Sequence, residues 1–518
     1  MHSDSQGAAT PPASFRPGVV VRPATRFTDA QLGLLHDGSL QILQDPGILC
    51  FNEEAVSVYA GAGCATERAP DAEAWIVRVP PPVIEEAIEA APSRVVLGAR
   101  EPANALVVDA HVPRVYFGTG SETNTVLEIE VGDAAPAGDE HRAALRYTHH
   151  RGAIRHLLDS ARLCNTLNNV DFFIRNVNIQ DEDIDDSNKD VNVFLACLMY
   201  MTKHVQAGLT SLDALEHVVR LGEIVAGGAD AFRAAPPLSF IACPVKSPLQ
   251  MVDDTTSKVM RIAERGIPLV LSSSPQGGST APVQEEGMLM QINAELLAAI
   301  ALTQLVRPGT PVLYGGVPVR ARLDTLHDLY GAPEFIQYHV GCAQLARRYG
   351  LPCYSSAGVG DSAVPGVQAT VEKIFSQFAV AQCGAPYIHY AFGLLDRTGT
   401  WCPAQAVIDN ANIEVVKGIL RPTKFEEADV QNAIGDVRKV MGSGTRLYAR
   451  LIRKQIRRGV VANPYMLESE GDHDRVLERA CDRLAELRAA PGEALPRQVI
   501  ESIRAEVPGL VPPERFVL

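Results

Sequence analysis

The sequence lacks paired cysteines and clustered metal ligands. Its ten cysteines stand singly, with no C-x-x-C pair and no His/Cys cluster at zinc spacing. No two histidines are spaced four residues apart, and no facial triad of metal ligands can be recognised. We therefore expect most of the cysteines to be buried and reduced, and we expect no intrinsic metal.

Long apolar runs and an excess of basic charge are also missing. No stretch approaches about 18 uninterrupted apolar residues, and residues 1–27 are polar and proline-rich, unlike the apolar core of a signal peptide. The net charge of -14 argues against nucleic acid as a partner. We expect a soluble, cytoplasmic protein without a membrane partner, in which residues 1–27 form a disordered N-terminal tail.

Nucleotide-binding motifs are absent as well. No G-x-G-x-x-G element follows a predicted strand, and no G-x-x-x-x-G-K-[ST] element occurs. From residue 112 onward, short β-rich runs alternate instead with helical stretches, which is typical of βα units and a parallel sheet. Eight such runs favour closure of the sheet over an open, doubly wound one. The predicted strands are 115–118, 170–177, 204–208, 238–243, 268–272, 311–315, 352–356 and 386–392.

The pattern predicts an α/β fold, a (β/α)8 TIM barrel with helical additions at both ends. The barrel is expected at 112–420. A helical N-terminal extension is expected at 28–111, where leucines have helical spacing and Pro81–Ala90 opens with prolines. Residues 421–518 become charged and helical, and predict a C-terminal helical region. Its apolar helices could support a homo-oligomer.

Three segments carry a resemblance to a known family. Residues 266–283 read GIPLVLSSSPQGGSTAPV, and 304–315 read QLVRPGTPVLYG. Residues 360–373 read GDSAVPGVQATVEK. Residues 384–393 read GAPYIHYAFG, and 405–410 follow as QAVIDN. In this order they resemble the trimethylamine methyltransferase family, and weaker likeness extends the match over most of residues 28–420.

The resemblance implies a (β/α)8 barrel that moves a methyl group from a methylated amine to the cobalt of a separate corrinoid-binding protein. Founding members carry pyrrolysine in the segment that matches Gly360–Pro365, whereas this chain has only standard residues there. In this it resembles the non-pyrrolysine branch, whose members use quaternary amines such as glycine betaine. The corrinoid, a cobalamin, would be the partner's cofactor.

A quaternary ammonium needs little acid–base chemistry. The leaving tertiary amine departs neutral, so no general acid is required, and the corrinoid supplies the nucleophile. The head group has no N–H to donate, so its recognition should depend on aromatic faces and on one or two carboxylates at a distance.

The expected catalytic residues come from the segment after the seventh strand. They are Asp361, Gln368 and Glu372, of which the last two lie one helical turn apart. Each has a structural alternative. Asp361 could cap a turn or a helix, and Glu372 could form a surface charge pair with Lys373.

Substrate-binding residues are expected at the carboxyl ends of the strands, where barrels place their sites. His389 and Tyr390 alternate on the last strand, so only one of them should point inward. Packing is the alternative for each aromatic residue. The candidates are Phe117, Gln276, Tyr314, Tyr354, His389, Tyr390 and Phe392.

Two other functions fit the same barrel. A lyase or isomerase would need a catalytic lysine at a strand end, for which Lys203 and Lys246 are the nearest residues. A binding-only paralogue would keep the cation pocket as a betaine sensor or scaffold without methyl transfer.

Overall fold

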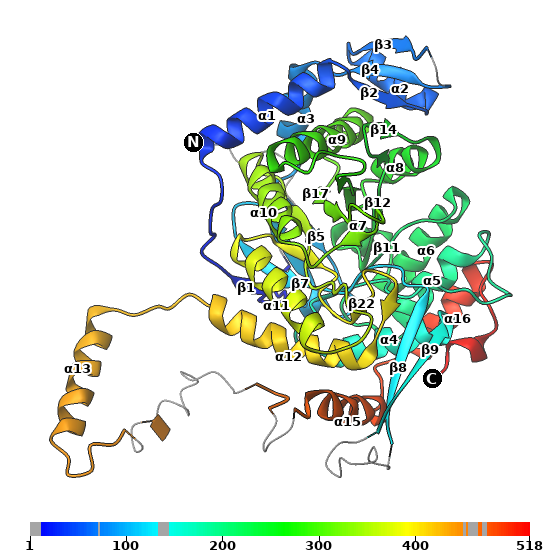
Figure 1. The fold of residues 1–518 in the computed structure, drawn as a ribbon. Helices are drawn as coiled ribbons and strands as arrows, with labels where there is room; N and C mark the ends of the chain where they lie inside the picture. Colours follow the sequence, from blue (N-terminus) through cyan, green and yellow to red (C-terminus); the bar gives the residue numbers. More distant parts are fainter. Residues whose placement is uncertain (1–11, 71–72, 133–143, 449–451, 454–464, 469–473) are drawn as a thin grey trace.

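The computed structural model describes residues 12–70, 73–132, 144–448, 452–453, 465–468 and 474–518 (Figure 1). Eight parallel strands form one curled sheet, with a ninth strand added antiparallel at its edge. Each of the eight coincides with a predicted strand to within a few residues. In chain order they are β7 (Arg114–Phe117), β10 (Phe172–Ile174), β11 (His204–Ala207), β12 (Leu238–Ala242), β15 (Leu269–Ser273), β17 (Val312–Gly316), β20 (Cys353–Ser356) and β21 (Tyr387–His389).

Helices pack around the outside of this sheet (Figure 1). α9 is long and apolar enough to cross a membrane by length and composition, but 83% of its apolar stretch is buried, which marks a core helix. α6 and α8 end where Gly227 and Gly266 adopt left-handed conformations. The helices that follow the strands include α4 (Ile154–Thr166), α5 (Lys189–Tyr200), α6 (Leu215–Ala226), α8 (Asp253–Arg265), α9 (Glu285–Val306), α10 (Pro333–Arg348), α11 (Val367–Gln382) and α12 (Pro403–Leu420).

The two outermost parallel strands of the sheet, β7 and β10, approach each other. A parallel bridge joins Gly118 to Phe172, and the Asp171 N–H donates to the Phe117 carbonyl at 2.7 Å. The Asp171 carboxylate accepts from the Phe117 N–H at 3.0 Å and forms ion pairs with Arg16 and Lys417. Burial alone would raise the pKa of Asp171, but these two cations bring it below its ordinary value.

Residues 12–27 belong to the predicted tail over 1–27 and contact the body of the protein, whereas residues 1–11 lie outside the described part. β1 (Val19–Val20) pairs antiparallel with β7, and Val21 is buried. The Arg16 guanidinium donates to Asp171 at 2.8 Å. The composition of this segment gives no sign of these contacts, because they are made with residues far away in the sequence.

A hairpin closes the amino-terminal end of the curled sheet. It consists of β5 (Arg94–Leu97) and β6 (Leu106–Asp109). Four of its side chains, Val95, Leu97, Leu106 and Val108, join one buried cluster with aromatic side chains from the inner faces of β7, β10, β20 and β21. Side chains of the hairpin therefore fill the interior at the amino-terminal ends of the strands.

The rest of the N-terminal region contains strands as well as the predicted helices. α1 (Asp29–Gln44), α2 (Glu53–Gly61) and α3 (Pro81–Ala90) are present, and Thr28 starts α1 with a capping box. Three short strands, β2 (Ile48–Cys50), β3 (Ala65–Arg68) and β4 (Trp75–Arg78), join β13 (Val245–Lys246) and β14 (Gln250–Met251) from beyond β12. The predicted helices are thus accompanied by strands that the sequence did not indicate. Pairing with a segment about 200 residues away leaves no local signal.

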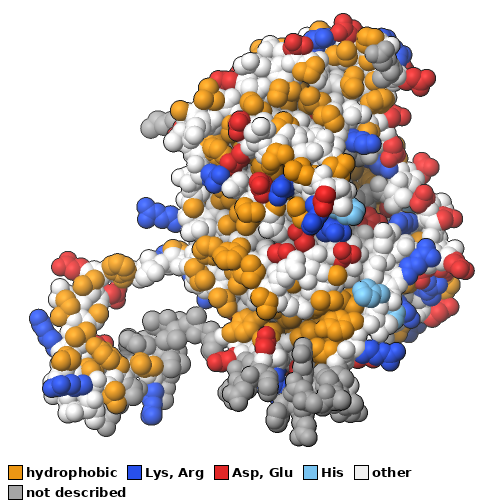
Figure 2. Space-filling model, in the orientation of Figure 1, with side chains coloured by type: hydrophobic (Ala, Val, Ile, Leu, Met, Phe, Trp, Pro, Cys, Tyr) orange, Lys and Arg blue, Asp and Glu red, His pale blue; other side chains and the backbone are white. Residues whose placement is uncertain are grey.

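The C-terminal region is helical where it is described. α15 (Val476–Ala489) packs on α12, and α16 (Arg497–Glu506) packs on α6. α13 (Glu427–Met441) stands away from the body on an extended linker (Figure 1). Figure 2 shows hydrophobic side chains both on this arm and on the body beside its base.

Gly118 tests the junction between β7 and β10. A Cβ atom at this position would lie 2.2 Å from the Phe172 ring, so we expect Gly118→Ala to lower the free energy of unfolding by about 1–3 kcal/mol. Gly418→Ala is the matched control, because a Cβ there meets nothing within 4 Å inside α12, and it should be neutral or stabilising. Urea denaturation of the three proteins measures both changes. Equal stability of the wild type and Gly118→Ala would contradict the packing described.

Candidate functional site

The carboxyl ends of the eight strands, called the mouth below, leave part of the interior accessible. Ile241 faces the interior cluster, and Cys243, two residues further along, points to the same side. Cys243 is exposed to solvent, yet the surrounding protein raises the pKa of its thiol. Its Sγ lies 2.6 Å from the Ser272 Oγ. The strand end at Cys243 is thus an accessible part of the interior, and it is called the recess below.

Aromatic rings line the interior beneath this recess. The Tyr354 and His389 rings stack with centroids 4.2 Å apart, and Tyr354 lies 5.8 Å from Tyr387. Tyr387 in turn stacks on Phe172 at 3.7 Å. These four side chains are buried. Together these rings form an aromatic layer, called the floor below.

Tyr390 joins this floor through an unusual backbone conformation. Its φ is 67°, which ends the alternation of β21 and lets its ring lie 3.6 Å, between centroids, from that of His389. The expectation that only one of the two could point inward was therefore wrong. Gly120 makes room, because a Cβ there would come within 2.7 Å of the Tyr390 ring.

The floor carries no positive charge. Burial lowers the pKa of His389 well below its ordinary value, so the imidazole is neutral near pH 7. The Nδ1–H of His389 donates to the Ser355 carbonyl at 2.8 Å, which leaves Nε2 as the acceptor. Burial also raises the pKa of Tyr354 and Tyr390, so both hydroxyls keep their protons.

A carboxylate stands at the rim. Asp328 in β19 (Asp328–Leu329) accepts hydrogen bonds from the Gln276 amide and, at 3.3 Å, from the Tyr330 hydroxyl. Its charge contributes to the raised pKa of Tyr390, after burial and Cys243. Gln276, predicted to bind substrate, is therefore brought to the mouth but bonded to Asp328.

Asp361, Gln368 and Glu372 lie close together, and the two carboxylates accept hydrogen bonds from backbone N–H groups. Asp361 accepts from the N–H groups of Tyr330 and Gly331, both at 2.9 Å. Glu372 accepts from the Asp361 N–H at 2.8 Å and from the Gln368 amide at 2.8 Å. The cluster ties the loop after β20 to the segment that carries Asp328 and Tyr330. Burial raises the pKa of Asp361.

Lys373 is buried beside this cluster, although a surface pair with Glu372 was one expectation. Its Nζ lies 3.1 Å from the Asp409 carboxylate, and both side chains are fully buried. Lys373 also donates to the carbonyls of Gly358 and Leu394, while Asp409 accepts from the Gly393 N–H at 2.7 Å. The pair thus links α11 and α12 to the loops that follow β20 and β21.

Three predicted binding residues face away from the interior of the sheet. Tyr314 donates its hydroxyl to Asn293 on α9 at 3.0 Å. The Phe117 ring lies 5.6 Å from the Lys417 Nζ on α12. Phe392 is buried in the main core between sheet and helices rather than in the interior cluster. Strand register decided these orientations, and a short apolar run in the sequence does not reveal it.

The sequence reasoning missed Cys243, Asp328 and Tyr330. Cys243 ends a predicted strand. Strand alternation places it on the same side as Ile241, so it would have been found had the inward direction of Ile241 been known. Asp328 and Tyr330 lie in an insertion between β17 and α10. Its strands β18 (Val319–Ala321) and β19 form a small sheet with β16 (Gln276–Gly277), which follows β15. Nothing local in the sequence marks their approach to Tyr390.

The lysines that a lyase would need are placed elsewhere. Lys203 donates to the carbonyls of Cys164 and Leu167 at the end of α4, each at 2.9 Å, and precedes β11 at the end opposite the mouth. Lys246 is exposed in β13. Among the described residues, no group of three His, Cys, Asp or Glu side chains could hold a metal ion.

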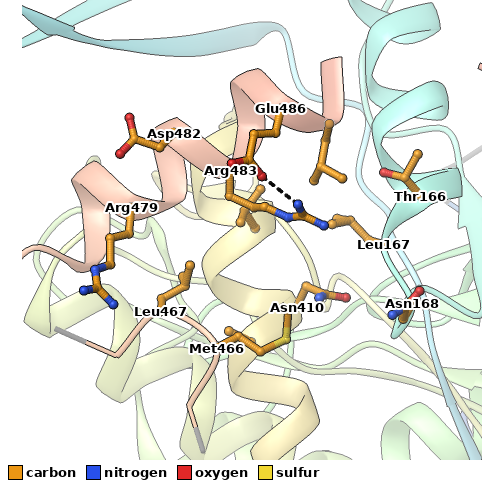
Figure 3. Close-up of a pocket in the computed structure, with 13 residues that line it drawn as sticks. Thr166, Leu167, Asn168, Asn410, Met466, Leu467, Arg479, Asp482, Arg483 and Glu486 are labelled. Carbon is orange, nitrogen blue, oxygen red and sulfur yellow. Dashed lines mark hydrogen bonds and ion pairs between the residues drawn. The ribbon is translucent and has the colours of Figure 1, made fainter. Parts of the chain in front are cut away.

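A separate cavity lies outside the sheet, between α4, α12 and α15 (Figure 3). It measures about 250 Å³ and is lined by Leu167, Leu467 and Leu487, with Arg483 and Glu486 paired at 2.7 Å. None of the predicted site residues lines it. Because no strand end reaches it, it offers nothing to the chemistry at the mouth.

Comparison with known proteins gives consistent matches. The family model described as trimethylamine methyltransferase (MTTB) matches residues 5–445. A trimethylamine methyltransferase of Desulfitobacterium hafniense is 30% identical over 79% of this chain and 78% of its own length. One of Methanosarcina mazei is 27% identical over 93% and 92%. A glycine betaine methyltransferase of Desulfitobacterium hafniense is 24% identical over 83% and 84%.

Buried neutral histidines predict a pH dependence of stability. Burial lowers the pKa of His204 to about 4, that of His339 to about 3, and that of His389 in the same direction. Below about pH 6.5 the unfolded chain therefore binds more protons, and the stability that is complete above this pH declines. The loss should reach about 2 kcal/mol per histidine at pH 5.

Urea titrations at pH 7.5, 6 and 5 measure the slope of the unfolding free energy against pH. His204→Gln should make it shallower, whereas His217→Gln, at an exposed position, should leave it unchanged. A stability that is constant or rises between pH 7.5 and 5 would show that these histidines are charged when folded.

Proposed function

Because the chain belongs to the trimethylamine methyltransferase family, we propose that it is a methyltransferase that moves a methyl group from a quaternary amine to the cobalt of a corrinoid-binding protein. The observation that carries this proposal is the neutral aromatic floor beneath an accessible mouth. Tyr354, His389 and Tyr390 offer π faces there without a competing positive charge.

We also propose that the sheet closes into a (β/α)8 barrel formed by residues 112–420, with 28–111 and 421–518 as additions. The bridge between Gly118 and Phe172 supports closure. So does the stacking of Phe172, on β10, against Tyr387, on β21, because the two strands lie near opposite ends of the strand order. A closed barrel directs the functional groups to one mouth.

The floor suits a fully alkylated nitrogen. A quaternary ammonium is attracted to ring faces within about 6 Å and makes no hydrogen bond through nitrogen. A neutral His389 does not repel it. Asp328, held by Gln276 and Tyr330, adds a negative charge at the rim that attracts a cation without touching its methyl groups. The two residues that hold Asp328 also keep it from rotating toward the substrate.

Methyl transfer needs positioning more than acid–base catalysis. The C–N bond breaks with its electron pair remaining on nitrogen, so the amine leaves neutral and takes up no proton from the protein. The corrinoid, when its carrier protein docks, supplies the electron pair for the new carbon bond. The residues of this chain therefore bind and orient the amine, exclude water, and leave one methyl group facing outward.

The mouth fits an external acceptor. Cys243 is exposed to solvent just beyond β12, which supports an upper interior that is accessible from outside. Asp361, Gln368 and Glu372 fix the loops around this opening rather than contact the substrate, so we propose them as positioning residues. We place the protein in the cytoplasm, where a corrinoid carrier and a small methylated amine would be its partners.

Spectroscopy tests the activity directly. The purified chain, its corrinoid protein and cob(I)alamin are mixed with glycine betaine, carnitine, γ-butyrobetaine, proline betaine, choline or trimethylamine. We expect at least one quaternary amine to convert Co(I) to methyl-Co(III), and trimethylamine to convert it least. No conversion across the panel contradicts the proposal. Tight betaine binding by calorimetry without conversion would indicate the binding-only paralogue instead.

Tyr390 gives a test within the site. Tyr390→Ala removes one face of the floor and should raise the KM for the amine by about 2-fold to 30-fold, the equivalent of about 0.5–2 kcal/mol of cation–π attraction. Tyr390→Phe keeps the ring and is the matched control, expected to stay near the wild type. The same KM in all three proteins would remove Tyr390 from the binding site.

A further inference from the structure

The arm helix α13 presents an apolar face that its own chain does not cover. Val430, Ile434, Val437 and Met441 recur at helical spacing, and their side chains are between 38% and 59% exposed. Every residue from Arg421 to Ile434 is exposed. The linker and the first half of the helix therefore pack against nothing that buries them.

An isolated helix of this size is not expected to persist in water. α13 has 15 residues, and isolated helices shorter than about 12–15 residues are marginal unless a packed apolar face stabilises them. The capping box between Glu426 and Asp429 fixes its start but buries no apolar surface. The helix consequently requires a partner surface.

A matching surface lies on the body. The outer faces of barrel helices are normally polar, yet α11 exposes Val367, Val371 and Phe375 at intervals of four residues, and α12 exposes Val415 and Ile419. These five residues are called the α11–α12 patch. Phe375 is 62% exposed and Ile419 is 64% exposed. In Figure 2, hydrophobic side chains gather on the body beside the base of the arm.

The patch is a continuous apolar surface that can receive a helix. α11 and α12 pack side by side, so their exposed apolar side chains adjoin one another. A pocket of about 490 Å³ lies at one end of the patch, where Val367, Val371 and Ile408 line it together with β9 (Ala144–Arg151) and residues of the C-terminal region. An amphipathic helix places its apolar side chains against such a surface at i, i+4 and i+7, the spacing that Val430, Ile434 and Val437 provide.

We propose that the arm of one chain covers the α11–α12 patch of a second copy, in a two-fold dimer with exchanged arms. The extended linker, residues 421–426, holds α13 away from its own body (Figure 1). Two-fold symmetry makes each contact occur twice, so both arms and both patches are covered together. The proposal does not depend on methyl transfer.

Light scattering coupled to size exclusion tests the assembly. We expect the wild type at twice the 55.7 kDa of one chain. Ile434→Glu with Val437→Glu on the arm, and Phe375→Glu on the body, should each give monomers with unchanged circular dichroism. Leu34→Glu is the matched control, because Leu34 is 71% exposed on α1, and it should stay dimeric. A monomeric wild type, or a dimer that survives the arm variant, overturns the proposal.

Cysteine crosslinking distinguishes arm-to-body contact from other arrangements. Ile434→Cys and Phe375→Cys chains are mixed and oxidised, with the wild type as control for Cys243. We expect a crosslinked heterodimer in the mixture and little crosslinking of either variant alone. Efficient self-crosslinking of Ile434→Cys would indicate paired arms, and an intrachain crosslink in the double variant would indicate an arm folded onto its own body. Either result contradicts the exchanged arrangement.

Discussion

The buried ion pair of Lys373 and Asp409 is the constraint on which the upper end of the fold depends. Removing two charges from water is costly, and the cost is offset here because each group also has hydrogen-bond partners. Those partners are backbone atoms of the loops after β20 and β21. The same two loops carry Asp361 and lead away from Tyr390. The position of the aromatic floor relative to the rim therefore follows from one interaction between α11 and α12.

The site combines neutrality inside with a negative charge at its edge. Burial keeps His389 uncharged and the tyrosine hydroxyls protonated, so the floor presents ring faces only. Asp328 contributes its charge from the rim. A cation is attracted both by the ring faces of the floor and by Asp328. An anion is repelled by Asp328 and is not attracted by the ring faces.

Much of the framework could be predicted from the sequence. The eight strands were found because buried parallel strands are continuous apolar runs bounded by Gly, Pro and Ser. Side-chain direction was harder, since Tyr314 and Tyr354 look equivalent in sequence but face opposite sides of the sheet. Tyr390 was among the predicted binding residues, but its inward direction could not be predicted, because it depends on a left-handed φ and on the space that Gly120, just beyond the neighbouring strand β7, leaves for the ring. Arg16 and Asp328 act through partners distant in the chain, which no local pattern encodes.

The pairing of β7 with β21 also constrains how the chain is made. Tyr116 lies opposite Tyr387, so an early strand must wait for the last one to leave the ribosome. During that interval β7 has an open edge, a hazard for aggregation. β1 covers the other edge of the same strand through Val19 and Val20, and both segments are synthesised early. β7 therefore keeps one edge open, the edge that receives β21, until the last strand has been synthesised.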